Sequence, residues 1–223
     1  MNNITKCQDL FALDSALFKN IFSHYEYPWE ILRHLRDIIE SLIKAGIDEY
    51  ERIDEWVLIG KGVQISNTAH IDGPAIIGSG TEVRHGAFIR GSALIGERCV
   101  IGNSSEVKNS IMMDEACAPH FNYVGDSILG KRAHLGAGAI CSNLRSDGKA
   151  VKIKLREQEP IDTKLRKLGA ILGDGAEVGC GAILCPGTIV GKSTVVYPLT
   201  LARGAYPSDS IVKNTDTVVP KRK

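Results

Sequence analysis

The chain has 223 residues, of which 43% are hydrophobic and 24% are charged, a balance that suits one folded domain with an appendage. Its formal net charge of +1 gives no global field that would attract nucleic acid or an anionic membrane, so neither is expected as a partner. Nothing resembles a signal peptide or a membrane span, and we expect a cytoplasmic protein. The six cysteines form no C-x-x-C pair and are interpreted as reduced core thiols rather than as disulfides or metal ligands.

Helices are predicted at the start of the chain. Residues 8–24 place apolar side chains on one broad face. A second helix is predicted to begin at Pro28, which suits a first helical turn, and to end at Gly46. These helices have too little apolar surface for an independent domain. We therefore expect residues 1–55 to form a helical cap over the open first coil of the domain that follows.

A six-residue repeat dominates the next part of the chain. Neither an amphipathic helix nor a simple strand has this period, which is typical of a parallel β-helix with triangular coils. Six residues then form one flat face and a corner, and residues eighteen apart stack in one column about 4.8 Å apart. We predict a mainly β fold with a β-helix over residues 56–206. The ten repeat positions, all aliphatic or Met, are Ile59, Ile65, Ile71, Ile77, Val83, Ile89, Ile95, Ile101, Val107 and Met113.

The repeat breaks twice. After Cys117 it resumes at Leu129, four residues late, so residues 118–126 are interpreted as straddling an insertion. After Cys141 it resumes only at Leu172, and the basic residues 143–168 form an excursion loop. Such an excursion from a regular solenoid is usually functional or disordered. Residues 207–223 are expected to form a C-terminal tail that runs back along the solenoid.

Two cations are predicted to share one column. Arg90 and Lys108 are eighteen residues apart, and each directly follows a core residue. Like charges one coil apart repel unless an anion lies between or over them, so the pair could bind a phosphate group. The pair could equally be a solvated one, neutralised by Asp72 or Glu106.

His120 lies within the first break of the repeat, beside other polar residues, although loop histidines are often merely exposed. His120 and His134 are fourteen residues apart and do not share a column. A zinc site shared between coils is therefore disfavoured, and no metal is expected.

Several motifs in this region resemble one known family. The resemblance is to the acetyltransferase half of bifunctional sugar-1-phosphate nucleotidylyltransferases, mainly of the archaeal type, and more distantly to bacterial N-acetylglucosamine-1-phosphate uridyltransferase. It covers about residues 57–205 and implies a left-handed β-helix and a homotrimer with sites between subunits. The family's nucleotidyltransferase domain, with its glycine-rich loop, has no counterpart in this sequence, so no nucleotidyltransferase activity is expected. The motifs are Glu106-Val-Lys108, Ala118-Pro-His-Phe-Asn-Tyr-Val-Gly-Asp126, Leu135-Gly-Ala-Gly138, Asn143-Leu-Arg145 and Lys167-Leu-Gly-Ala170.

The resemblance also implies roles for residues. Acetyl-CoA would be the co-substrate, with no metal required for acyl transfer. The family's base is a histidine, which implies His120, oriented by Glu106 or Asp126, and the family's phosphate contacts imply Arg90 and Lys108. The remaining expected contacts are Tyr123, His134 and Asn143 for the sugar substrate, and Asn143 and Cys180 for coenzyme A.

We therefore expect an acyl-CoA-dependent acyltransferase that N-acetylates an amino-sugar 1-phosphate or a related sugar phosphate. Aminolysis of a thioester requires a base and donors for the oxyanion, which would be backbone N–H groups in the Gly136–Gly138 turn or near Gly179. The basic excursion would meet the phosphates of coenzyme A, unless it is a solvated loop. The alternative is a non-catalytic sugar-phosphate or sugar-nucleotide binding subunit. Retention of His120 favours the enzyme, because a scaffold needs no base.

Overall fold

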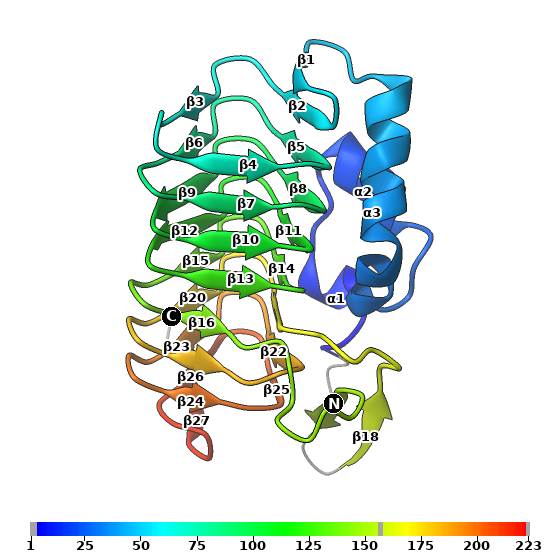
Figure 1. Cartoon of the computed structure of the whole chain (residues 1–223). Coiled ribbons are helices and arrows are strands. Elements are labelled where there is room, and N and C mark those ends of the chain that lie inside the picture. The colour runs from blue at the N-terminus through cyan, green and yellow to red at the C-terminus, as the bar shows by residue number, and fades with distance from the viewer. Residues whose placement is uncertain (1–3, 156–157, 222–223) are drawn as a thin grey trace.

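The computed structural model describes residues 4–155 and 158–221 and forms a left-handed parallel β-helix flanked by helices (Figure 1). Three parallel sheets wind around one axis, so each coil contributes one strand to each sheet. Partners in the first coils are eighteen residues apart, as Ile77 and Ile95 are. The predicted fold class and column spacing are therefore confirmed.

The three sheets are named A, B and C. Sheet A contains β1 (Glu51–Asp54), β2 (Val57–Ile59), β5 (Ala75–Ile77), β8 (Ala93–Ile95), β11 (Ser110–Met112), β14 (Ile128–Leu129), β19 (Ala170–Leu172), β22 (Thr188–Val190) and β25 (Ala205–Tyr206). Sheet B contains β3 (Gln64–Ile65), β6 (Glu82–Val83), β9 (Val100–Asn103), β12 (Cys117–His120), β15 (His134–Leu135), β20 (Glu177–Val178), β23 (Val195–Val196), β26 (Ser210–Val212) and β27 (Val218–Pro220). Sheet C contains β4 (His70–Asp72), β7 (Phe88–Arg90), β10 (Glu106–Lys108), β13 (Tyr123–Gly125), β16 (Ile140–Cys141), β21 (Ile183–Leu184) and β24 (Leu201–Ala202).

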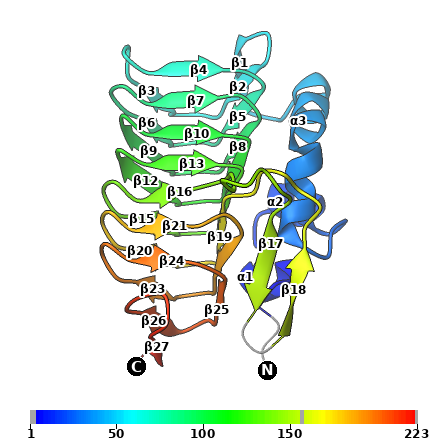
Figure 2. The ribbon, with the colours of Figure 1, turned by 60° about the horizontal axis from the view of Figure 1, so that its bottom comes forward.

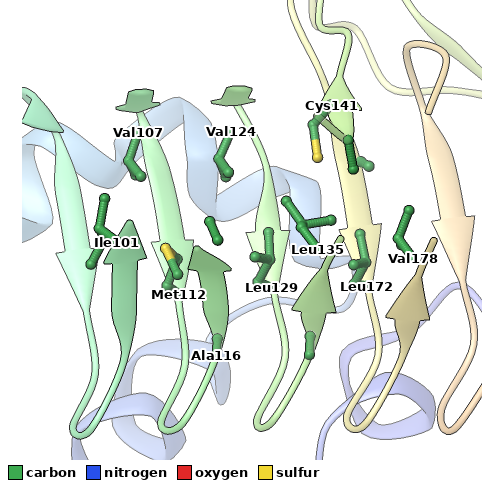
Figure 3. Close-up of a cluster of buried hydrophobic side chains, with 14 of the residues drawn as sticks. Ile101, Val107, Met112, Ala116, Val124, Leu129, Leu135, Cys141, Leu172 and Val178 are labelled. Carbon is green, nitrogen blue, oxygen red and sulfur yellow. The ribbon is translucent and has the colours of Figure 1, made fainter. Parts of the chain in front are cut away.

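The interior of the solenoid is filled by the predicted aliphatic column. Figure 3 shows Ile101, Val107 and Leu135 pointing into one continuous core. Among the cysteines, Cys7, Cys99 and Cys141 are buried, whereas Cys180 is exposed and so is not the core thiol that the sequence suggested.

Two successive coils are one residue shorter than the eighteen-residue coils that precede them. Met112, rather than the predicted Met113, faces the interior and pairs with Ile95, and Leu129 pairs with Met112. The predicted insertion at residues 118–126 is therefore wrong. One residue fewer turns the corner between sheets C and A in each coil. Asn109 and Asp126 make this turn with φ of 46° and 48°, a left-handed conformation that Asn and Asp tolerate better than most residues.

The helices lie along the flat outer face of sheet A and do not cover the open first coil as predicted (Figure 1). They are α1 (Cys7–Leu10), α2 (Ala16–Phe22) and α3 (Pro28–Ala45), so the expected helix over residues 8–24 is divided in two. Sheet A needs this cover because its outward column is apolar. The column consists of Leu58, Ile76, Leu94, Ile111, Ile128, Ile171 and Ile189, each at most 3% exposed. Burying a side chain of this size typically contributes about 1.5–3 kcal/mol.

The boundaries of α3 agree with the prediction, with Pro28 in the first turn and Gly46 at the C-cap. Asp174 fastens the segment between α1 and α2 to the solenoid, because its carboxylate accepts the backbone N–H groups of Ala12 at 2.7 Å and Lys131 at 2.9 Å. No described helix is long and apolar enough to cross a membrane.

The excursion contains a β-hairpin, β17 (Lys152–Leu155) and β18 (Gln158–Asp162), which stands beside the lower coils (Figure 2). Val151 and Ile153 are buried in the same apolar cluster as the helices, so the hairpin is packed onto the solenoid. In the tail, β26 pairs with β23 and adds a strand to sheet B, and β27 then turns back antiparallel on β26.

Candidate functional site

Arg90 and Lys108 occupy one column at the carboxyl end of sheet C, as predicted. Asp72 pairs with Arg90 in the coil before, and Val107 pairs with Ile89, which brings Lys108 beside Arg90. Arg90 Nη1 donates to Glu106 Oε1 at 2.9 Å, and this hydrogen bond raises the pKa of Arg90. The guanidinium is thus a stable cation that already has one carboxylate partner.

Asp126 connects the two shortened corners with the start of the excursion. Its carboxylate is 5% exposed and accepts the side-chain amides of Asn109 at 2.8 Å and Asn143 at 2.5 Å. Lys108 Nζ lies 3.7 Å from the same carboxylate. Asn143 also donates to the Tyr123 hydroxyl at 3.2 Å. Partial burial and the nearby Glu106 carboxylate raise the pKa of Tyr123, so the phenol is neutral at pH 7. These contacts bring together the predicted substrate residues Lys108, Tyr123 and Asn143.

His120 lies at the opposite end of the same face, where sheet B turns into sheet C. Its backbone N–H donates to Asn122 Oδ1 at 3.0 Å. Asn122 is 3% exposed and donates to the carbonyls of Gly136 and Ala139, which fixes this corner on the next coil. The imidazole is exposed, and no described side chain hydrogen-bonds to it. The expected orienting residues are engaged elsewhere, Glu106 with Arg90 and Asp126 with the two asparagines.

The other predicted contacts divide between two faces. Cys180 is exposed at the His120 corner, two coils further along, because Gly138 N–H donates to the His120 carbonyl and Gly181 N–H donates to the Ala137 carbonyl. His134 instead lies on the outer face of sheet B, between Cys117 and Glu177. The structure therefore does not bring His134 together with the other substrate residues.

The Gly136–Gly138 turn contains one free donor. The N–H groups of Gly136 and Gly138 donate to the carbonyls of Val178 and His120, and the N–H of Gly179 donates to Val196. Among the described residues no acceptor is recorded for the Ala137 N–H, which is therefore the donor of this turn that remains for a ligand.

Helix α3 adds residues that the sequence did not suggest. A cleft of about 410 Å³ at the Arg90 corner is lined by Arg36 as well as by Lys108 and Asn109. A second cleft, of about 490 Å³, lies between the hairpin and the lower coils and is lined by Lys152, Lys154 and Arg203. Only the spacing of Leu58, Ile76 and Leu94 could have indicated where α3 lies. Within the described ranges no three His, Cys, Asp or Glu side chains gather as a metal site would require.

Comparison with known proteins connects these features to one class of enzyme. A family model described as GMPPB C-terminal domain matches residues 71–157. The bifunctional protein GlmU of Methanococcus aeolicus is 34% identical over 105 residues, which are 47% of this chain and 25% of that protein. The chain resembles the acetyltransferase half of such bifunctional enzymes. This confirms the resemblance that the motifs indicated.

Two further comparisons agree. A bifunctional sugar-1-phosphate nucleotidylyltransferase/acetyltransferase of Sulfurisphaera tokodaii is 38% identical over 80 residues, 36% of this chain and 20% of that protein. The chain thus spans about a quarter of the length of the curated relatives that it matches. UDP-N-acetylglucosamine acyltransferase from Campylobacter jejuni shares the fold, with a TM-score of 0.53 over 74% of this chain and 71% of that chain, at 15% identity.

Proposed function

We propose that the chain is a coenzyme A-dependent acyltransferase that N-acetylates an amino-sugar 1-phosphate or a related sugar phosphate. The observation that supports this most directly is the arrangement of sheet C, with stacked phosphate-binding cations at one end of its face and an exposed histidine at the other. The resemblance to acetyltransferase domains agrees with this assignment.

In the proposed reaction the amino group of the sugar attacks the carbonyl carbon of the acetyl thioester. His120 takes a proton from the attacking nitrogen, the C–S bond breaks, and the coenzyme leaves as its thiol after protonation. The Ala137 N–H, in the coil after His120, is available to donate to the developing oxyanion. Arg90 and Lys108 bind the sugar phosphate, with Tyr123 and Asn143 beside it.

Coenzyme A carries several phosphate groups, and the hairpin cleft offers cations for them. Lys152 and Lys154 of β17 and Arg203 of the last coils line this cleft, and no carboxylate lies within 4.0 Å of these three among the described residues. Asn143 at the base of the excursion and Cys180 at the His120 corner remain proposed coenzyme contacts. No metal takes part in the proposed step.

A homotrimer is part of the proposal. An apolar strip of exposed side chains follows sheet C and its corner below His120, and it consists of Phe121, Ile140, Ile183, Leu199 and Leu201. Exposed apolar patches of this kind commonly mark contacts between subunits. A second copy seated on the strip would also approach His120, whose imidazole has no orienting partner among the described residues of its own chain.

The assay that tests the function is release of free thiol from acetyl-CoA with a panel of amino-sugar phosphates, using wild-type protein and the His120→Ala variant. Turnover that depends on His120 supports the transferase. The alternative is a sugar-phosphate or sugar-nucleotide binding subunit. It predicts ligand binding without thiol release from any member of the panel.

A further inference from the structure

Two neighbouring clefts lie between helix α3 and the corner at which sheet C turns into sheet A, and we call them together the corner cleft. Figure 1 shows the carboxyl ends of β4, β7 and β10 directed toward α3. The upper half is the 410 Å³ cleft lined by Arg36, Arg90 and Lys108. The lower half, of about 520 Å³, extends toward the base of the excursion. Asn109 lines both halves and marks their boundary, where its side-chain amide donates to the Leu32 carbonyl of α3 at 3.5 Å.

The corner cleft carries an excess of positive charge. Six cationic side chains line its two halves, against the carboxylates Asp72 and Asp126 in the lining and Glu106 and Glu40, which pair with Arg90 and Arg36. The Asp126 oxygens already accept two amides, and Arg36 Nε contacts Glu40 at 2.8 Å, which leaves the terminal nitrogens of Arg36 free to bind a ligand. Gathered cations repel one another unless an anion lies among them. The six are Arg33, Arg36, Arg90, Lys108, Arg166 and Lys167.

The lower half differs from a simple phosphate site. Arg33, Arg166 and Lys167 have no carboxylate within 4.0 Å among the described residues. Leu32, Leu144 and Leu165 add apolar surface to the same half of the cleft. Apolar surface does not help to bind phosphate, but it packs against a flat base, and guanidinium groups stack on the faces of aromatic rings. This combination suits the nucleoside part of a nucleotide.

We propose that the corner cleft binds the nucleoside diphosphate part of a nucleotide-linked amino sugar, with Arg36 of α3 holding the diphosphate together with Arg90 and Lys108. This inference rests on the proposed function, since it names the substrate class of the same site. A three-residue strand such as β10 or β13 spans about 10 Å, so a ligand held in the cleft must cross the face of sheet C before its amine approaches His120 of the same chain. A diphosphate linkage supplies length that a single phosphate does not.

The test is calorimetric titration of the full chain with UDP, GDP and inorganic phosphate, without acetyl-CoA. The variant is Arg36→Gln, and the matched control is Lys61→Gln, which removes an exposed cation from the first coil outside the cleft. Arg36 is 65% exposed on its helix, so its replacement leaves the fold intact, as circular dichroism will verify. We expect at least one of the two nucleotides to bind about tenfold more tightly than phosphate. Arg36→Gln should weaken that binding about tenfold or more, as loss of a charge-assisted contact does, while Lys61→Gln should not.

Equal affinity for nucleoside diphosphates and phosphate would overturn the inference. Nucleotide binding that is unchanged in Arg36→Gln would overturn it as well. Because binding is measured without acyl transfer, the nucleotide-binding inference and the proposed acyltransferase function can be contradicted independently. Arg36-dependent nucleotide binding with no transferase activity would contradict the proposed function alone, whereas transfer to a sugar 1-phosphate without nucleotide binding would contradict this inference alone.

Discussion

The side-chain amide of Asn143 donates to the Asp126 carboxylate at 2.5 Å, and this contact fixes the start of the excursion on the preceding coil. Because Asp126 also accepts the Asn109 amide, one buried carboxylate holds both shortened corners beside Lys108. The geometry of the proposed phosphate site therefore depends on a carboxylate whose oxygens are already bonded to two side-chain amides.

Replacing this carboxylate should destabilise the protein. Asp126→Ala leaves the amides of Asn109 and Asn143 without their acceptor, and an unsatisfied buried group costs about 1–3 kcal/mol. Urea unfolding should show this loss, and the KM for the phosphorylated substrate should rise as Lys108 loses its neighbour. Asp72→Ala, an exposed change in the Arg90 column, is the control and should leave the unfolding midpoint nearly unchanged. Equal effects of the two variants would mean that the Asp126 contacts do not hold the corner.

Substitution at an inward position of β7 should reduce stability far more than substitution at the neighbouring outward position. Ile89 is 0% exposed, so Ile89→Asp places an unpaired carboxylate in the core. This costs about 3 kcal/mol or more and should abolish folded protein. Arg90→Ala, the next residue, removes an exposed side chain and should shift the melting temperature little. A large loss of stability in Arg90→Ala would show that its ion pair with Glu106 is structural.

Loss of the base should lower kcat, whereas loss of a phosphate contact should raise KM. His120→Ala should lower kcat by about 10²–10⁴-fold, the usual contribution of a positioned base, with KM for the sugar phosphate nearly preserved. Lys108→Ala should instead raise KM, because a charge-assisted contact contributes about 1.5–3 kcal/mol. Steady-state kinetics on folded variants provide the measurement. A stable His120→Ala protein with near-normal turnover would contradict the catalytic assignment.

Buried thiols should make stability depend on alkaline pH. Burial raises the pKa of Cys7, Cys99 and Cys141 to about 12 each, whereas an unfolded thiol titrates near about 8.5. The folded pKa is the higher one, so this contribution is complete below about pH 8.5 and is lost as the pH rises toward 12, by up to about 1.4 kcal/mol per pH unit per thiol. Urea unfolding at pH 8 and pH 10 should show the decline, and a Cys99→Ala and Cys141→Ala double variant should show less of it. An identical pH dependence in both proteins would contradict this account.

The apolar strip should control assembly. Leu199 is 84% exposed and Leu201 is 53% exposed, so replacing each with Asp costs little in a single chain but places charges in any interface built on the strip. Light scattering should show that the wild-type trimer dissociates in the Leu199→Asp and Leu201→Asp double variant. Lys61→Asp, an exposed change in the first coil and away from the strip, should leave the mass unchanged. A wild-type protein that light scattering shows to be a monomer would contradict the proposed homotrimer.

The six-residue period by itself determined the interior of this protein. A side chain that recurs at the same point of each coil must face the axis, so Ile77, Ile89 and Ile101 could be assigned to the core from spacing alone. The same spacing placed Arg90 and Lys108 in one column, because neighbouring coils pair in register. Motifs that resemble a known family then supplied roles that periodicity does not contain, such as that of His120.

Only the tertiary structure decided where the period is broken and what the helices cover. Two corners that are each one residue shorter shift the six-residue repeat in much the same way as a single insertion does, so the sequence does not distinguish the two cases. Counting by six therefore predicts Met113 in the core, where the structure has Met112. The position of Arg36 beside Lys108 is a relation between a helix and a corner far apart in the chain. It follows from the burial of the outward apolar face of sheet A, a free-energy gain that no local pattern in α3 reveals.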